Sequence, residues 1–506
     1  MTGKPDPFVQ KRTDLPKRLK GQAMLWFVGL IATMMLVGVG VYSVGQVTSE
    51  KQKVVNATDA AAYSGGLVQA RALNFIAYGN RAEIANEVFL AQYVSFHSWL
   101  LYMEQAVENL NTITDILYAI PFAQPIAAFI DRVLTAVEEM LEGAEDMVDG
   151  SYFAVIGPIE AYASALRGAS AMILNGPALA LSAKQAADTV LAQNLANQNG
   201  KQDTAPTAVK GVELGALNVV AWNEAFSQYT KDKQIHNSSD GRKTAADILL
   251  ASRDAFSTQR VGPSGLLAPV IGNFRIGGCP FPGIEVGSSR DGPTLLKDYE
   301  RWEAQDTSEF YTRSPAKCRR NSIPVGWGRA TVAREQEEGD ARYSPHREAG
   351  MWAYEEQRTK SGWSGVKELY DLERDLTNGR PNKSEFVFHY AAAKQAARVK
   401  TNDQLGVFGA DNSTRHLGNT RLQPNLPEGE IASIAAAKVH FARPIRDSRD
   451  FTGVTLFRAD AHKEVASLYN PYWQVRLTTP DNLAMLAAYG GNAALSVFSP
   501  NSTLLP

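Results

Sequence analysis

The sequence lacks the residue patterns that enzymes most often use for catalysis. It has no His-Glu-x-x-His pair, no Cys-x-x-Cys pair and no Gly-x4-Gly-Lys-Ser/Thr loop. These absences exclude the commonest zinc peptidase, thiol redox and nucleotide-binding layouts. Ser364 stands in Gly362-Trp-Ser-Gly365, which is one residue short of a nucleophile turn of the Gly-x-Ser-x-Gly type. We therefore expect a protein that is not an enzyme, with no catalytic residue, cofactor or metal.

Cysteine and net charge are also scarce. The 506 residues include two cysteines, Cys279 and Cys318, and the formal net charge is −2. A charge this small gives no overall basic field for nucleic acid, so we expect no nucleic-acid partner. In an oxidising compartment an even pair of cysteines suggests one disulfide, which would close a loop of about 40 residues. Two unrelated buried thiols are the alternative.

A third absence concerns charge near the N-terminus, because residues 23–46 contain no Asp, Glu, Lys or Arg. At about 1.5 Å per residue, this segment forms a helix of roughly 36 Å, which is enough to cross a bilayer core of about 30 Å. A cleaved signal peptide has an apolar stretch of about 7–15 residues and a small-residue cleavage site. This segment is longer, and Val44-Gly-Gln-Val47 matches such a site poorly. We expect a retained transmembrane helix over 23–46.

The charges on either side of this segment predict its orientation. Six basic residues precede it, whereas Lys51 and Lys53 follow it beside Glu50; the six are Lys4, Lys11, Arg12, Lys17, Arg18 and Lys20. Excess Lys and Arg stay on the cytoplasmic side. The prediction is a single-pass protein of the bacterial inner membrane, with a cytoplasmic tail over 1–22 and its bulk in the periplasm.

The next part of the chain is typical of helices. No proline occurs between residues 47 and 120, and good helix formers are abundant there. The membrane helix should therefore continue outward as a stalk, with bends at Gly65-Gly66 and Gly79-Asn80. Apolar periodicity and proline positions predict further helices over 126–149, 158–174, 178–197, 209–229 and 245–256. Residues 47–259 are thus expected to be a mainly helical periplasmic region.

The composition changes near residue 260. Gly, Pro, Arg and Trp become frequent, and long periodic segments disappear. Short strands are expected over 385–390, 435–443 and 453–458. We predict an irregular α+β periplasmic region over 260–506. The expected fold class is therefore α+β, with one N-terminal transmembrane helix that continues into a helical stalk or bundle.

Two local features allow a functional or a structural interpretation. The predicted helix 126–149 carries an acidic run that could suggest a metal site, but no histidine is near in the sequence, so a solvated face is favoured. Tyr469, Tyr472 and Trp473 cluster around Asn470-Pro471. These aromatics either pack a turn onto the body or form a contact patch for a partner.

Two segments at the N-terminus carry a family resemblance. Lys20-Gly-Gln-Ala-Met24 leads into the apolar segment, and Asn56-Ala-Thr-Asp-Ala-Ala-Ala62 follows it. This order resembles the N-terminal region of TadG-like proteins of bacterial Flp (tight adherence) pili, and Tyr469-Asn-Pro-Tyr-Trp473 near the end resembles the tail of longer members. The resemblance covers residues 18–92 and is weak over the middle of the chain. The small side chains Ala57, Ala60, Ala61 and Ala62 would let another helix approach closely.

The sequence departs from two relatives of that pilus system. Asp149-Gly-Ser-Tyr-Phe153 and Asp411-Asn-Ser-Thr-Arg415 both lack the last serine of the Asp-x-Ser-x-Ser metal motif, so no von Willebrand A domain is expected. Pseudopilins carry Glu five residues after their cleavage site. If Gly21 marked that site, the fifth residue would be Trp26. The anchor is therefore expected to remain uncut.

The resemblance implies a non-enzymatic, structural component of Flp pilus assembly, a process that serves adhesion. Its partners would be other pilus-assembly or secretion components, and residues 23–46 would contact the lipid bilayer. Two alternatives stay open from the residues alone. One is a membrane-tethered periplasmic sensor or binding protein, and the other is an envelope hydrolase with an unrecognised site.

Overall fold

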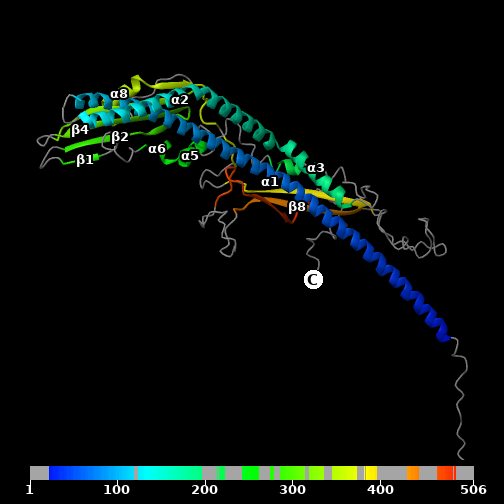
Figure 1. The fold of residues 1–506 in the computed structure, drawn as a ribbon. Coiled ribbons are helices and arrows are strands. Elements are labelled where there is room, and N and C mark those ends of the chain that lie inside the picture. Colours follow the sequence, from blue (N-terminus) through cyan, green and yellow to red (C-terminus); the bar gives the residue numbers. More distant parts are fainter. Residues whose placement is uncertain are drawn as a thin grey trace, which may run out of the picture.

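The longest element of the structure is one helix that joins the apolar N-terminal segment to the body. The computed structural model describes residues 22–118, 124–195, 214, 216–220, 222, 242–260, 274–278, 285–313, 318–334, 345–367, 369–372, 381, 383–395, 430–443, 464–482 and 484–485. Within them, α1 (Gln22–Tyr118) runs for 97 residues. Figure 1 shows α1 in blue, with its first part projecting alone and its remainder lying along the body.

The bends expected at Gly65-Gly66 and Gly79-Asn80 are wrong, because α1 passes through both pairs unbroken. The first pair instead lets a sheet approach the helix closely. A Cβ atom on Gly65 would lie 2.1 Å from the ring of Phe388, and one on Gly66 would lie 2.9 Å from the Cβ of Ala437. These glycines are therefore contact positions within a continuous helix.

Two helices return along α1. They are α2 (Gln124–Leu174) and α3 (Gly176–Leu195), and both pack against α1. The helices expected over 126–149 and 158–174 are one helix, with Pro158 inside it. Two shorter helices, α5 (Arg242–Ser252) and α6 (Ala255–Thr258), also contact α1. Together they correspond to the single helix that was expected over 245–256. Of the segment 209–229, residues 214, 216–220 and 222 are helical and the others lie outside the described residues.

A six-stranded sheet packs on the far half of α1. It has the order β1-β2-β4-β5-β6, and β3 pairs with β4. Its strands are β1 (Phe274–Ile276), β2 (Glu285–Asp291), β3 (Thr294–Lys297), β4 (Arg301–Arg313), β5 (Arg320–Ala333) and β6 (Arg358–Ser361). Neighbours are antiparallel except β5 and β6, which are parallel. Helix α8 (Arg347–Glu355) contacts β4 and β5.

A three-stranded antiparallel sheet packs on the near half of α1. Its strands are β7 (Glu385–Gln395), β8 (Glu430–Phe441) and β9 (Trp473–Thr478), in that order. The strands expected over 385–390 and 435–443 correspond to β7 and β8, whereas 453–458 lies outside the described residues. Figure 1 shows this sheet beside α1 at the level of α3. The last part of the chain thus packs on one of its first parts.

The large cores of the body all include α1. Trp302, Trp363 and Leu90 belong to the core under the six-stranded sheet, whereas Leu73 and Trp473 belong to the core under the three-stranded one. Both sheets therefore depend on the same helix for their buried surface. The α+β class with a long N-terminal apolar helix is confirmed. The segment boundaries at 22, 46 and 259 stay predictions, and the tail before residue 22 lies outside the described residues.

Candidate functional site

The first part of α1 has the surface of a membrane-spanning helix. Among the described residues, one helix is long and apolar enough to cross a membrane, and its most apolar window is not buried at all. Large apolar side chains that include Met24, Trp26, Phe27, Leu36 and Val44 are exposed. In water this much exposed apolar surface is unfavourable. A lipid bilayer would cover it, which is compatible with membrane anchoring.

The body begins at Glu50, about one helical turn after the apolar segment. The carboxylate of this buried residue accepts hydrogen bonds from Lys53 Nζ at 2.9 Å and from Lys394 Nζ of β7 at 2.7 Å. Burial raises the pKa of Glu50, but the two lysines outweigh it and hold that pKa below its usual value. Lys51 Nζ also donates to the carbonyl oxygen of Ala432 in β8. These bonds attach the sheet to α1 directly beside the anchor.

The small residues Ala57, Ala60, Ala61 and Ala62 lie on the next turns of α1. Ala57, Ala61 and Ala62 are buried, and Ala60 is half-buried. The three buried alanines share one core with Ala183, Ala187 and Leu191 of α3 and with residues of β7 and β8. The helix that approaches this segment is thus α3 of the same chain.

The aromatic segment near the C-terminus packs largely inside the body. Trp473 contacts the rings of Phe386 and Phe441, and its Nε1 donates to the carbonyl oxygen of Ser467 at 3.2 Å. Tyr469 and Trp473 are buried, whereas Tyr472 is half-buried with its ring edge against Phe441. Two of the three rings expected as a possible contact patch are therefore core residues.

The cysteines are described only in part. Cys318 is disulfide-bonded and has a positive φ of 47°. Cys279 lies outside the described residues. The expected pairing of Cys279 with Cys318 stays a prediction, and mass spectrometry of peptides from the unreduced protein tests it.

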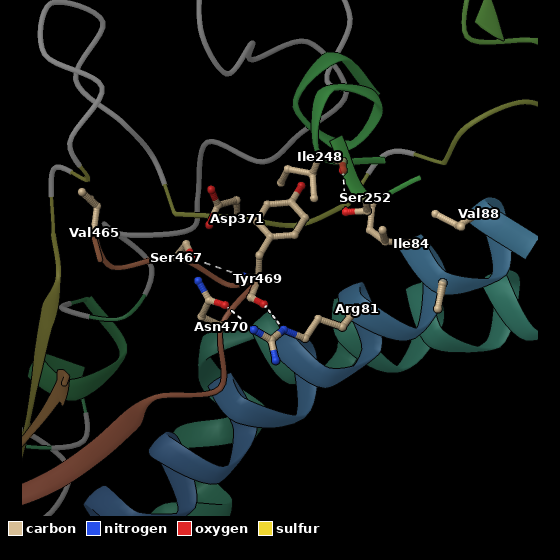
Figure 2. A pocket seen from close by; sticks show the side chains of 11 residues that line it. Arg81, Ile84, Val88, Ile248, Ser252, Asp371, Val465, Ser467, Tyr469 and Asn470 are labelled. Carbon is tan, nitrogen blue, oxygen red and sulfur yellow. Dashed lines mark hydrogen bonds between the residues drawn. The ribbon is translucent and has the colours of Figure 1, made fainter. Parts of the chain in front are cut away.

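A cavity opens where α1, α5 and the C-terminal segment meet, and Figure 2 shows its lining. It measures about 690 Å³. Apolar side chains of Ile84, Val88 and Ile248 lie on one side of it, whereas Ser252, Asp371 and Ser467 are among its polar residues. Arg81 Nε donates to the carbonyl oxygen of Tyr469 at 2.7 Å, and Arg81 also bonds Asn470. The lining thus combines an apolar wall with a guanidinium that is bonded to the C-terminal segment.

Two buried carboxyl groups lie one turn apart on another face of α1, where Glu83 lines a much smaller pocket against α2. Glu83 and Glu87 are each 2% exposed, and Trp363 Nε1 donates to Glu87 Oε1 at 3.2 Å. Neither Glu83 oxygen has a hydrogen-bond partner among the described residues. Burial raises the pKa of Glu83 to about 7 and that of Glu87 to about 8, and repulsion between the two adds to the latter. Their i, i+4 spacing is visible in the sequence, but only the packed structure shows that both are buried.

The exposed apolar segment, the continuous helix and the two sheets define the class of this protein: an α+β body on a helix that is long and apolar enough to span a membrane. Residues 21–72 match a family model described as putative Flp pilus-assembly TadE/G-like. The resemblance found in the N-terminal motifs is thus confirmed for this segment, and it supports involvement in Flp/Tad pilus assembly. The matched residues contain both the exposed apolar segment and the first buried turns of α1. Neither the curated proteins nor the solved structures include a match to this chain.

Proposed function

We propose that this protein is a non-enzymatic inner-membrane component of Flp/Tad-type pilus assembly. Residues 23–46 hold it in the bilayer, the tail before them is cytoplasmic, and the body from Glu50 onward is periplasmic. The observation that carries the proposal is the position of the family match. Residues 21–72 begin at the anchor and end on α1 beneath the three-stranded sheet.

The contacts of α1 support a structural role for the body. One helix provides the anchor and a part of every large core, so the position of the body follows that of the helix. The Ala57–Ala62 segment is occupied by α3 and the three-stranded sheet. Partners in the pilus machinery would therefore bind elsewhere, on exposed positions of α1 such as Gln52 and Tyr63 or on the outer surface of the sheets.

Deletion of the gene tests the proposal. We expect the deletion strain to lose surface pili or to show altered pili by electron microscopy and to adhere less, and we expect the full-length chain to restore both. A chain whose residues 23–46 are replaced by a cleavable signal peptide is the matched control, and it should restore neither. Normal piliation and adherence of the deletion strain would contradict the proposal.

The proposed orientation has a separate test. A cysteine placed at exposed Tyr63 should react in intact spheroplasts with a maleimide that cannot cross the membrane. A cysteine at Thr2 should react only after the membrane is opened with detergent. The reverse pattern would place the body in the cytoplasm.

A further inference from the structure

The fold brings together a histidine and two acidic residues that are far apart in the sequence. His97 is on α1, whereas Glu145 and Asp149 are one turn apart on α2. His97 Nε2 lies 3.5 Å from Glu145 Oε1 and 4.0 Å from Asp149 Oδ1. The three donor atoms all lie within 4.8 Å of one another. Most of the acidic run is exposed, as expected for a solvated face, namely Glu138, Glu139, Glu142 and Asp146, whereas the α1–α2 pairing places half-buried Glu145 beside His97.

The imidazole is buried and points at the two carboxylates. His97 is 3% exposed, and its Nε2 has no hydrogen-bond partner among the described residues. Buried polar atoms are normally satisfied by a hydrogen bond or by an ion. Asp149 Oδ1, by contrast, is paired with Lys360. An imidazole nitrogen beside two carboxylate oxygens is a set of metal ligands.

Two side-chain cations already lie next to these carboxylates. Lys360 Nζ is 2.7 Å from Asp149 Oδ1, and Arg358 Nε is 3.8 Å from Glu145 Oε1. Both belong to β6, a short strand at the edge of its sheet. Their side chains are 22% and 57% exposed, so each can move into solvent. The two carboxylates therefore attract positive charge, and a metal ion that binds Asp149 would have to displace the ammonium group of Lys360.

We propose that His97, Glu145 and Asp149 form a binding site for a divalent transition metal of the zinc or manganese class. Imidazole nitrogen suits zinc and the two carboxylates also suit manganese, whereas Ca²⁺ and Mg²⁺ prefer oxygen ligands alone. Zinc bonds of about 2.0–2.2 Å in a tetrahedron place ligand atoms roughly 3.3–3.5 Å apart. The two histidine–carboxylate distances thus need to shorten by less than about 1 Å, and water would take the fourth position.

The bound ion would fasten α2 to α1 in the half of the body that lies away from the apolar segment. His97 follows Gln46 by 51 residues of unbroken helix, which is about 75 Å at 1.5 Å per residue. A metal here ties α2 to α1 beside β6. Because only the folded chain holds the three ligands together, metal should stabilise the fold.

Metal titration of the full-length chain in detergent micelles tests the proposal. After removal of metal with a chelator, we expect calorimetry with ZnCl2 or MnCl2 to show one saturable site per chain and a higher Tm. His97→Gln and Asp149→Asn should each weaken binding at least tenfold. Asp146→Asn, which changes an exposed acid on the same turn, is the matched control and should bind as the unaltered chain does. Lys360→Met removes the competing cation and should tighten binding by about tenfold.

Several results would overturn the site. They are the lack of saturable binding by the unaltered chain, equal affinity in the Asp149→Asn and Asp146→Asn variants, and tighter binding of Ca²⁺ or Mg²⁺ than of zinc and manganese. If His97→Gln fails to fold, Lys360→Met still decides, because its side chain is partly exposed. Unchanged affinity in Lys360→Met would contradict the geometry described here.

Discussion

The two sheets meet the same helix in different ways. At the three-stranded sheet, small residues of α1 make the closest contacts: Gly65 approaches Phe388 and Gly66 approaches Ala437. At the six-stranded sheet, the contact includes buried polar groups, and Ser98 Oγ donates to Asp306 Oδ2 at 2.7 Å. The interface of α1 with the three-stranded sheet (the near interface) thus combines closely packed small residues with the buried Glu50–Lys394 pair, whereas the interface with the six-stranded sheet (the far interface) is distinguished by a buried network around Asp306.

Asp306 is the centre of the far interface. It is fully buried, accepts from Arg260 Nε at 2.9 Å and lies 3.4 Å from Arg290 Nη2. Arg260 Nη1 also donates to Thr294 Oγ1 at 2.7 Å, and Thr294 contacts Ser95 of α1. The Asp306 carboxylate on β4 thus pairs with two guanidinium groups, and the network reaches β2 through Arg290 and α1 through Thr294.

The largest effect is expected from Asp306→Ala. The substitution leaves two buried guanidinium groups without their carboxylate, and breaking a buried ion pair in this way costs about 3–5 kcal/mol. Urea unfolding followed by circular dichroism measures the loss. Asp291→Ala, on β2 of the same sheet but half-buried, is the control, with an expected change of about 0.5 kcal/mol or less. Equal effects would show that the far interface does not depend on this charge.

The second-largest expected effect is a dependence of the free energy of unfolding on pH, which comes from the buried acids Glu83 and Glu87 of α1. The ordinary pKa is near 4.5, whereas burial raises that of Glu83 to about 7 and that of Glu87 to about 8. Between these pKa values the folded state binds more protons than the unfolded state does. The stability that the two protonated acids contribute is therefore complete below pH 4.5 and is lost as the pH rises to about 8. Glu87→Gln should raise stability at pH 8 by on the order of 3 kcal/mol and leave it nearly unchanged at about pH 4.5.

Unfolding curves at the two pH values measure this difference. Glu142→Gln changes an exposed acid on α2 and should leave the pH dependence as it is. A Glu87→Gln variant whose stability falls between about pH 4.5 and pH 8 as steeply as that of the unaltered chain would contradict the assignment.

The smallest effect is expected from overpacking the near interface. Ala61→Leu adds three carbon atoms where α1, α3 and the sheet meet, and overpacking of this kind costs about 1–3 kcal/mol. Ala165→Leu, at an exposed position of α2, should cost almost nothing. Thermal unfolding measures both. If Ala61→Leu is as well tolerated as Ala165→Leu, the near interface does not depend on side-chain size.

The same contrast explains what the sequence predicts and what it does not. The uncharged segment of α1, the helix α3 and the strands β7 and β8 follow from composition and apolar patterns. Strands β4 and β5 were missed, although they are the longest among those described. Asp306, Thr307, Ser308 and Glu309 of β4 are all buried, so the strand has neither an apolar run nor a polar–apolar alternation. Their partners are distant in the sequence, which leaves no local signal.

Other misses have the same cause. Gly65-Gly66 suggested a bend because glycine weakens a helix. The partner that needs those glycines, Phe388, is more than 300 residues away. Pro158 suggested a helix start, but it lies at an exposed position where the loss of one hydrogen bond is tolerated. The acids Glu145 and Asp149 could not be linked to His97 before the pairing of α1 with α2 was known.

The central claim is that the exposed apolar segment and the helix at the core of the body are one unbroken helix. The most direct test is the distance between two spin labels, placed at exposed Val44 and Tyr78 of the full-length chain in lipid nanodiscs. They are separated by 34 residues, so pulsed electron paramagnetic resonance should give a narrow distribution near about 51 Å. A broad distribution centred well below this distance would show a hinge between anchor and body or at Gly65-Gly66, and would contradict the account.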